Sequence, residues 1–273
     1  MRETSATTKT FRARELGVSR STLYYKPKKP ERDWGMKCHI EEVLREHHSY
    51  GSRRIAIHLQ MNRKGIQRVM GIFGIKPYRR RGMKYKKTKN IKVIYPNLLL
   101  TTSPAYEGHI WATDFTYIWF QGRFVYVATV IDLYTRKIVG LSVYTTHAVI
   151  LVVSALMSAL EHNARPEIFH SDNGSEYNSA VFIDALQTVG TLISRSAPGC
   201  PWENGYQESF YNQFKVDLGD PSRFKNLGEL VLAIYQTIYA YNHTRIHSAL
   251  KMSPVEFARQ EGNATISLYK ISV

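Results

Sequence analysis

The chain contains little that would tie it to an oxidising compartment or to a membrane. Its only two cysteines, Cys38 and Cys200, are too few for a disulfide framework and fit a reducing environment. The longest apolar-rich stretch, residues 149–160, is far shorter than the roughly 20 residues that a bilayer-spanning helix needs. The first residues are polar and basic, so no signal peptide is expected. These features predict a cytoplasmic protein.

Acidic residues are scarce in the first part of the chain. Residues 1–100 contain 25 Lys and Arg against 7 Asp and Glu, a net charge of +18, whereas residues 101–273 contain 12 against 15, a net charge of −3. Hydrophobic residues make up 44 % of the chain, which excludes wholesale disorder. A basic front on a nearly neutral body predicts binding to a polyanion such as DNA. The alternative is a front that serves only solubility.

The start of the basic front has the pattern of two short helices. We predict a helix-turn-helix remnant over residues 1–30, with a turn at Gly17 and a second helix capped by Ser19. Pro27 and Pro30 then predict a linker.

A helical DNA-binding domain with a basic arm is predicted over residues 36–92. Apolar spacing indicates helices at 36–47, 53–61 and 63–73, and the run 76–92 contains Lys and Arg but no acid. Some of the basic side chains are expected to be merely solvated, and the rest suit contact with DNA phosphates. The candidate DNA-binding residues are Arg53, Arg54, Arg63, Lys64, Arg68, Arg79, Arg80 and Arg81.

In the body, the spacing of apolar residues indicates strands as well as helices, whereas in the front it indicates helices only. Strands are predicted at 109–119, 123–131, 137–144, 166–171 and 190–194, with helices at 147–162, 178–188 and 204–218. This order predicts an α/β fold with a mixed five-stranded sheet flanked by helices. We assign the catalytic core to residues 105–220. The C-terminal helical extension is assigned to 221–273, with helices at 226–242 and, short and capped by Ser253-Pro254, at the end.

Three acids of the body fall where catalytic groups are expected. Asp114 lies inside an apolar, aromatic strand, Asp172 follows a later strand directly, and Glu208 lies in the first turns of a helix. If the two strands are neighbours, the three carboxylates can meet, and such hard donors suit Mg²⁺ or Mn²⁺. Each acid also has a structural alternative: Asp172 could cap a turn, Glu208 could be solvated, and Asp114 could pair with a buried arginine.

Spacing and flanking motifs give these acids a family resemblance. The 35 residues between Asp172 and Glu208 make the set similar to the DD(35)E triad of the retroviral integrase and bacterial transposase superfamily. Four segments of the body resemble core motifs of insertion-sequence transposases of the IS-three type: WATDFTYI (111–118), HSDNGSEY (170–177), GCPWENGYQESFYNQFK (199–215) and YNHTRIHSALKMSPVEF (241–257). In the front, EHHSYGSRRI (46–55) and NRKGIQRVMGIFGI (62–75) resemble the helical domain that precedes the core in that family.

The resemblance implies an RNase H-like core and a transposase that cleaves DNA and transfers strands at the ends of an insertion sequence. It implies that Asp114, Asp172 and Glu208 are the catalytic acids and hold two Mg²⁺ or Mn²⁺ ions per active site. It places Lys215, two helical turns beyond Glu208, against DNA. Two alternatives are an RNase H-like nuclease without strand transfer and a non-catalytic helix-turn-helix regulator.

The resemblance also implies partners. These are double-stranded DNA, as terminal inverted repeats and as target, and further copies of the chain in a synaptic complex at the bacterial nucleoid. The chain resembles the downstream-frame product of such elements, so it is expected to be fused to, or partnered by, an upstream-frame product.

Other acids and histidines near the motifs are further candidates for the site. Glu176, Glu203 and Asp132 are nearby acids, and we rank Glu208 above Glu203 because the 35-residue spacing and the Glu-Ser-Phe context both select it. His170 and His247 are candidates for orienting the site, with a purely structural role as the alternative.

Overall fold

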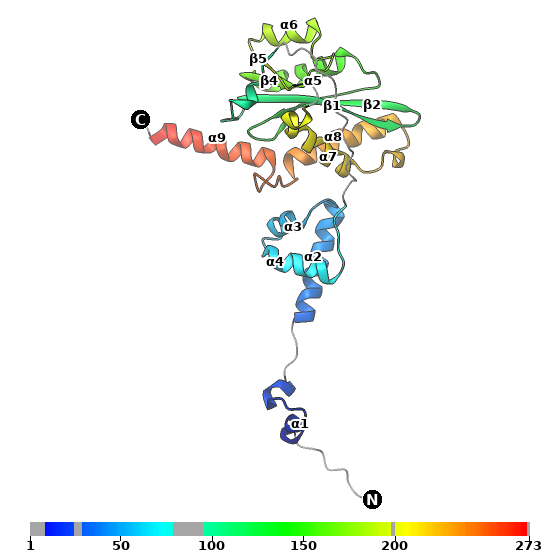
Figure 1. Cartoon of the computed structure of the whole chain (residues 1–273), viewed down its shortest axis with the longest axis vertical. Coiled ribbons are helices and arrows are strands. Elements are labelled where there is room, and N and C mark those ends of the chain that lie inside the picture. The colour runs from blue at the N-terminus through cyan, green and yellow to red at the C-terminus, as the bar shows by residue number, and fades with distance from the viewer. Residues whose placement is uncertain (1–8, 25–28, 79–94, 198–199, 272–273) are drawn as a thin grey trace, which may run out of the picture.

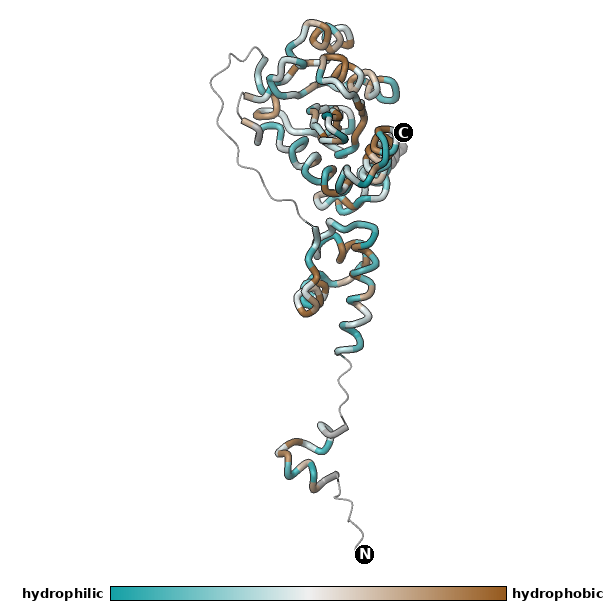
Figure 2. The backbone as a smooth tube through the Cα atoms, turned by 90° about the vertical axis from the view of Figure 1, so that its right-hand side faces the viewer, coloured by the Kyte–Doolittle hydropathy of each residue, from teal (hydrophilic) through white to brown (hydrophobic). Residues whose placement is uncertain are grey.

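The computed structural model describes residues 9–24, 29–78, 95–197 and 200–271. Figure 1 shows a small N-terminal element, a compact helical unit and a larger α/β body, arranged one after another along the long axis of the molecule. In the perpendicular view of Figure 2, hydrophobic segments gather inside the body and alternate with hydrophilic ones along the helices. Within the described ranges, no helix is both long enough and apolar enough to cross a bilayer.

The N-terminal element only partly follows the helix-turn-helix prediction. Helix α1 (Lys9–Glu15) is followed by Gly17 at φ 63°, a left-handed conformation that suits glycine. The next element is a 3-10 helix, η1 (Arg20–Tyr24), and the Thr22 N–H donates to Ser19 Oγ at 3.4 Å, so the second helix with its Ser19 cap is present in 3-10 form. Leu16 and Val18 are exposed at the turn, so neither is buried between the two helices.

The helical unit contains the three predicted helices, with one boundary corrected. They are α2 (Lys29–Glu46), α3 (Ser52–His58) and α4 (Arg63–Ile72), and they bury a small core that includes Ile40, Ile55 and Ile66. Helix α2 begins well before the predicted residue 36, so the assignment of Pro30 to a linker is wrong. Proline is compatible with the first turn of a helix, where its missing N–H has no intrahelical partner.

The body is built on a mixed five-stranded sheet, which confirms the RNase H-like α/β prediction. The strands are β1 (Ile110–Phe120), β2 (Arg123–Asp132), β3 (Ile138–Tyr144), β4 (Ile168–Ser171) and β5 (Leu192–Arg195). Their order in the sheet is β3-β2-β1-β4-β5. The pairs β1–β2 and β2–β3 are antiparallel, whereas β4 runs parallel to β1 and to β5.

Helices cover both faces of the sheet (Figure 1). On one face, α5 (Val149–His162) and α6 (Ala180–Thr188) pack with the sheet into one hydrophobic cluster. On the other face, α7 (Gly205–Leu218) and α8 (Leu227–His243) complete a second cluster. The sheet is therefore sandwiched between two helical layers, as the predicted order of elements requires.

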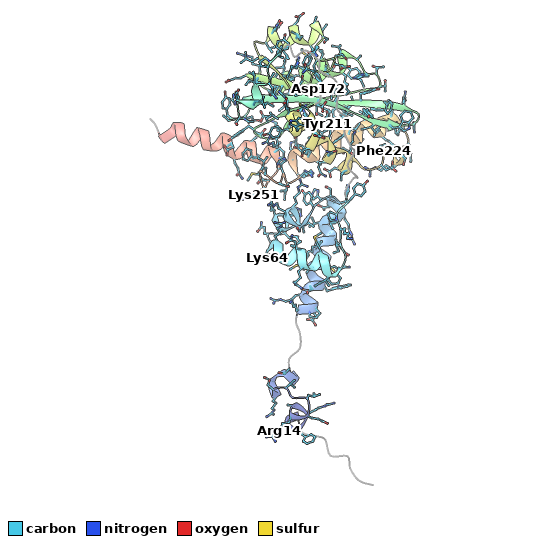
Figure 3. The ribbon with its side chains drawn as sticks, in the orientation of Figure 1. Arg14, Lys64, Asp172, Tyr211, Phe224 and Lys251 are labelled. Atoms are coloured by element: carbon cyan, nitrogen blue, oxygen red, sulfur yellow. The ribbon has the colours of Figure 1, made fainter. Side chains whose placement is uncertain are left out.

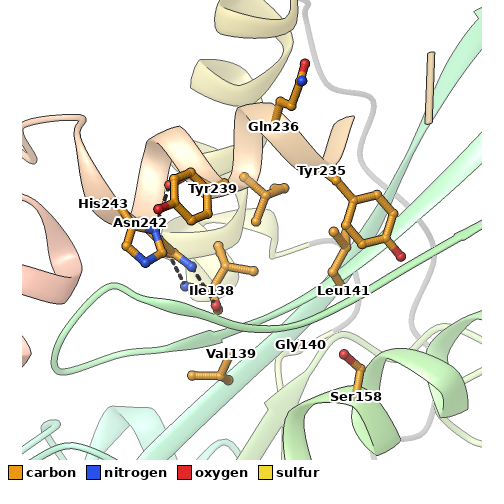
Figure 4. A pocket seen from close by; sticks show the side chains of 11 residues that line it. Ile138, Val139, Gly140, Leu141, Ser158, Tyr235, Gln236, Tyr239, Asn242 and His243 are labelled. Carbon is orange, nitrogen blue, oxygen red and sulfur yellow. Dashed lines mark hydrogen bonds between the residues drawn. The ribbon is translucent and has the colours of Figure 1, made fainter. Parts of the chain in front are cut away.

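Helix α8 is fixed to the edge strand β3 by one amide side chain (Figure 4). Asn242 Oδ1 accepts the backbone N–H of Ile138, and its Nδ2 donates to the Ile138 carbonyl, both at 2.9 Å. The last helix, α9 (Pro254–Ile271), is longer than the short helix predicted there. Ser253 Oγ accepts the N–H of Glu256 at 3.3 Å and so starts α9 as an N-cap.

Candidate active site

Asp114 lies in β1, and Asp172 directly follows the neighbouring parallel strand β4. The β1–β4 pairing sets Ala112 opposite His170, and each aspartate lies two residues further along its own chain. Because side chains on a strand repeat every second residue, Asp114 shares the face of Ala112. Both aspartates are half-buried. The two strands are thus neighbours, which is the condition that the sequence argument required.

The environment of Asp114 favours its protonated form. Burial, together with the negative charges of Asp172 and Glu208, raises the pKa of Asp114 to about 8. Two groups oppose this shift: the Phe115 N–H, which donates to Asp114 Oδ1 at 2.8 Å, and the ammonium of Lys215. The carboxylates of Asp172 and Glu208 therefore both act electrostatically on Asp114.

Asp172 is held in a tight turn after β4. The Gly174 N–H donates to Asp172 Oδ1 at 2.9 Å. Burial raises the pKa of Asp172, while this hydrogen bond and the charge of Arg195 lower it. The turn-capping role that the sequence allowed for Asp172 is therefore present, together with its position beside Asp114.

Two buried side chains fix α7 across β1 and so position Glu208. Gln207 Nε2 donates to the Ala112 carbonyl at 2.7 Å, and the Tyr211 hydroxyl donates to the Asp114 carbonyl at 2.6 Å. Figure 3 shows Asp172 and Tyr211 in this part of the body. Sequence reasoning missed both contacts, although their four-residue spacing around Glu208 places them on one helical face.

Arg195 is a third residue that sequence reasoning missed. It is fully buried at the end of β5, where its guanidinium donates to Ser171 Oγ and to the Tyr177 carbonyl, each at 2.7 Å. Ser171 precedes Asp172, so this arginine supports the backbone beneath the carboxylate. The sequence signal that could have identified Arg195 is a charged residue at the end of a short apolar strand.

The three carboxylates suit a hard divalent cation chemically, but their side chains are not close enough together to coordinate one. Across the described ranges, no three His, Cys, Asp or Glu side chains are grouped closely enough to hold a metal ion. Repulsion from Asp172 and Glu208 nevertheless raises the pKa of Asp114, and the Phe115 N–H and Lys215 offset it only in part. A divalent cation would neutralise that repulsion, and carboxylate oxygens are the ligands that Mg²⁺ and Mn²⁺ prefer.

The competing acids have structural partners. Glu176 lies 3.0 Å from the His147 ring nitrogen. Glu203 Oε2 accepts the Ala197 N–H at 2.7 Å and the Asn97 amide at 2.8 Å. Asp132 is also committed to structure, because it is fully buried and accepts several hydrogen bonds of the turn that follows β2.

The two candidate histidines lie in buried or half-buried positions. His170 is fully buried, its Nδ1 lies 2.8 Å from Ser194 Oγ, and burial lowers its pKa to about 4. Burial likewise lowers the pKa of His247 to about 4, with the nearby Arg136 as the next cause. Neither histidine carries a proton charge at neutral pH.

The candidate DNA-binding residues differ in exposure and in their contacts within the fold. Arg53, Arg63 and Lys64 are exposed on α3 and α4. Arg68, by contrast, forms a two-point ion pair with Asp33, which joins α4 to α2.

The remaining candidates lie closer to the body or beyond the described ranges. Arg54 is half-buried. Lys215 Nζ lies 5.3 Å from the centre of the Tyr117 ring and contributes to the electrostatics of Asp114, so it is next to the acidic site. Arg79, Arg80 and Arg81 lie outside the described residues.

Comparison with known proteins defines the class of this core. Residues 104–201 match the Integrase core domain family, and residues 189–254 match a second family with the same description. The chain is 32 % identical to the transposase for insertion sequence element IS904 of Lactococcus lactis, over 81 % of this chain and 92 % of that protein. It is 29 % identical to the putative transposase InsK for insertion sequence element IS150 of Escherichia coli, over 90 % and 92 %. The chain therefore belongs to the family of insertion-sequence transposases with an integrase core domain.

Solved structures give a more distant comparison. A chain of the simian T-cell lymphotropic virus intasome, solved in complex with the PP2A regulatory subunit B56 gamma, is 16 % identical, with a TM-score of 0.49. That match covers 81 % of this chain and 74 % of the viral one.

Proposed function

We propose that Asp114, Asp172 and Glu208 form the DDE-type catalytic site of this transposase and hold two divalent metal ions. One observation carries the proposal: β1 and β4 are parallel neighbours that bring Asp114 and Asp172 to matching positions, with Glu208 within electrostatic reach of Asp114. Members of the integrase core domain family are divalent-metal dependent. The domain division 1–30, 36–92, 105–220 and 221–273 is part of the same proposal.

The chemistry is phosphoryl transfer on DNA. When bound, the metal ions would activate the attacking oxygen and stabilise the leaving oxygen of an in-line displacement. The role of the chain is to hold the three carboxylates on one rigid frame, through the β1–β4 pairing and through the contacts of Gln207 and Tyr211. Hydrolysis at an element end would release a 3′-hydroxyl, and transfer of that hydroxyl to a target phosphate would join the strands.

The DNA substrate is proposed to contact both parts of the chain. Exposed Arg53, Arg63 and Lys64 would contact phosphates from the helical unit, and Lys215 would do so beside the carboxylates. Two element ends would be held by several copies of the chain in a synaptic complex, with the upstream-frame product as a fused or separate partner.

A strand-transfer assay tests the proposal. The full chain is incubated with labelled DNA from the ends of its own element, target DNA and Mg²⁺. We expect Asp114→Asn, Asp172→Asn and Glu208→Gln each to lower the yield at least about 100-fold while DNA binding is retained. Asp184→Asn, which changes an exposed acid on α6, is the matched control and keeps wild-type activity. Strand-transfer products that persist in Glu208→Gln would refute the assignment. Cleavage without joining would favour the nuclease alternative.

A further inference from the structure

A basic cavity lies at the junction between the helical unit and the body. Its volume is about 280 Å³, and its walls come from α3, from the segment after β2, from α7 and from the segment after α8. Among the described residues that line it there is no Asp or Glu, whereas three arginines do so: Arg54, Arg136 and Arg245. Elements far apart in the sequence thus bring three positive charges to one cavity.

The three guanidinium groups are incompletely paired. Arg54 Nε, Arg136 Nη1 and Arg245 Nη2 are buried and have no hydrogen-bond partner among the described residues. Arg245 as a whole is only 5 % exposed. Arg136 lies 4.1 Å from the centre of the Tyr206 ring, and Arg54 lies 5.7 Å from that of Tyr50, contacts that orient the cations without neutralising them. Buried cations without acceptors are costly, so the cavity is suited to an anion.

Asp217, which pairs with one of these arginines, is already engaged by other groups. Asp217 Oδ2 lies 2.8 Å from Arg245 Nε. Its Oδ1 accepts from Ser49 Oγ and from Gln213 Nε2, both at 2.9 Å. This carboxylate therefore pairs with one of the three guanidinium groups, Arg245, and a net positive charge remains on the cluster.

His247 supplies a neutral donor at the same place. Its lowered pKa keeps the imidazole uncharged at neutral pH. The Ala249 N–H donates to His247 Nδ1 at 3.3 Å, so the ring proton is on Nε2. This leaves one N–H that can donate to a ligand.

We propose that this cavity binds a phosphate group of the DNA backbone, so that the helical unit and the body hold one DNA strand together. The inference rests on the proposed function, because it takes DNA as the substrate. Guanidinium groups match phosphate oxygens in charge and geometry, and α7 carries cavity residues as well as Glu208. The cavity would thus set the position of the strand relative to the carboxylates.

The first experiment measures phosphate binding by the full chain without DNA. Thermal unfolding is followed while inorganic phosphate replaces chloride at constant ionic strength. We expect a saturable rise of the melting temperature that is lost in Arg136→Gln and kept in Arg136→Lys. Gln60 and Gln121 adopt positive φ angles like that of Arg136, so glutamine is compatible with this turn. Arg123→Gln, an exposed arginine on β2, is the matched control and keeps the rise.

The second experiment identifies the source of the phosphate. Affinity for element-end DNA should fall about tenfold in Arg136→Gln and remain unchanged in Arg123→Gln. An unchanged phosphate response in Arg136→Gln would overturn the proposed site. Loss of that response without loss of DNA affinity would assign the cavity to free phosphate and overturn the DNA assignment. Glu208→Gln separates the two proposals, because it should abolish strand transfer and leave the phosphate response intact.

Discussion

At the residue scale, the hydroxyl of Tyr211 joins α7 to β1 at Asp114. It donates to the Asp114 carbonyl at 2.6 Å and accepts from Thr129 Oγ1 at 2.9 Å. We predict that Tyr211→Phe lowers the free energy of unfolding by about 1–3 kcal/mol, because buried partners are left unsatisfied. Urea unfolding measures the change. Tyr239→Phe, at an exposed position on α8, is the control and should stay within about 0.5 kcal/mol of the parent.

His170 predicts a second residue-scale effect, on the pH dependence of stability. Burial lowers its pKa from 6.5 to about 4, so between these values the unfolded chain binds more protons than the folded one. Its contribution to stability is therefore present above pH 6.5 and is lost as the pH falls toward 4, by up to about 1.4 kcal/mol per pH unit.

Urea unfolding at several pH values checks this effect. His170→Asn should show a weaker pH dependence than the parent between pH 4 and 6.5. His39→Asn, at an exposed position on α2, should keep the parent's dependence. Identical profiles for the parent and His170→Asn would contradict the prediction.

Single residues also show how far the candidate site could be predicted from the sequence. Asp114, Asp172 and Glu208 were predicted because an acid in an apolar strand and a 35-residue spacing are local signals. Gln207 and Arg195 were not predicted, because a polar side chain at the same spacing can equally face solvent. Only the packed fold shows that both are buried and bonded to backbone beneath the site.

At the element scale, the tight contact between β3 and α5 depends on a glycine. A Cβ atom at Gly140 would lie 2.3 Å from the Ala155 carbonyl oxygen and 2.8 Å from Ala159 Cβ. Gly140→Ala must therefore push α5 away from the sheet, and we expect it to cost about 1–3 kcal/mol of stability. Gly71→Ala is the matched control, because nothing lies within 4 Å of its added Cβ and alanine favours the helix. It should be neutral or stabilising by up to about 1 kcal/mol in the same unfolding experiment.

Helices and strands were predicted well where the spacing of apolar residues matches the side that packs in a hydrophobic cluster. All five strands and the helices of the body agree with the predicted apolar patterns, because their apolar side chains are buried in the two hydrophobic clusters on either face of the sheet. The errors lie where the deciding contact is distant in sequence. Helix α2 extends upstream to Asp33 and beyond, and Asp33 pairs with Arg68 of α4, a partner that local periodicity cannot reveal.

At the scale of the whole molecule, the concentration of positive charge in residues 1–100 predicts strongly salt-dependent DNA binding. Each phosphate contact contributes about −0.9 to the slope of log K against log salt concentration. We predict that replacing Arg53, Arg63 and Lys64 together by Gln makes the slope less negative by about 2.7, since all three are exposed and available to phosphates. Fluorescence anisotropy with duplex DNA at several salt concentrations measures the slope.

The control for this experiment changes a basic residue that is occupied within the fold. Arg68→Gln should lower the melting temperature through loss of its ion pair with Asp33, with less effect on the slope than Arg53→Gln has, because the charge of Arg68 is already paired. A triple variant with an unchanged slope would contradict the assignment of those side chains to phosphate contact.

The matching positions of Asp114 and Asp172 have a consequence for how such a chain tolerates insertions and deletions. The residues between the two acids include turns and a helix that can lengthen or shorten without moving either strand. A one-residue deletion inside β1 between Ala112 and Asp114, by contrast, would shift the later side chains by one place and turn Asp114 to the opposite face of the sheet. Related chains can therefore differ in the number of residues between these acids, but Asp114 must keep its phase within β1, and Asp172 must keep its place directly after β4.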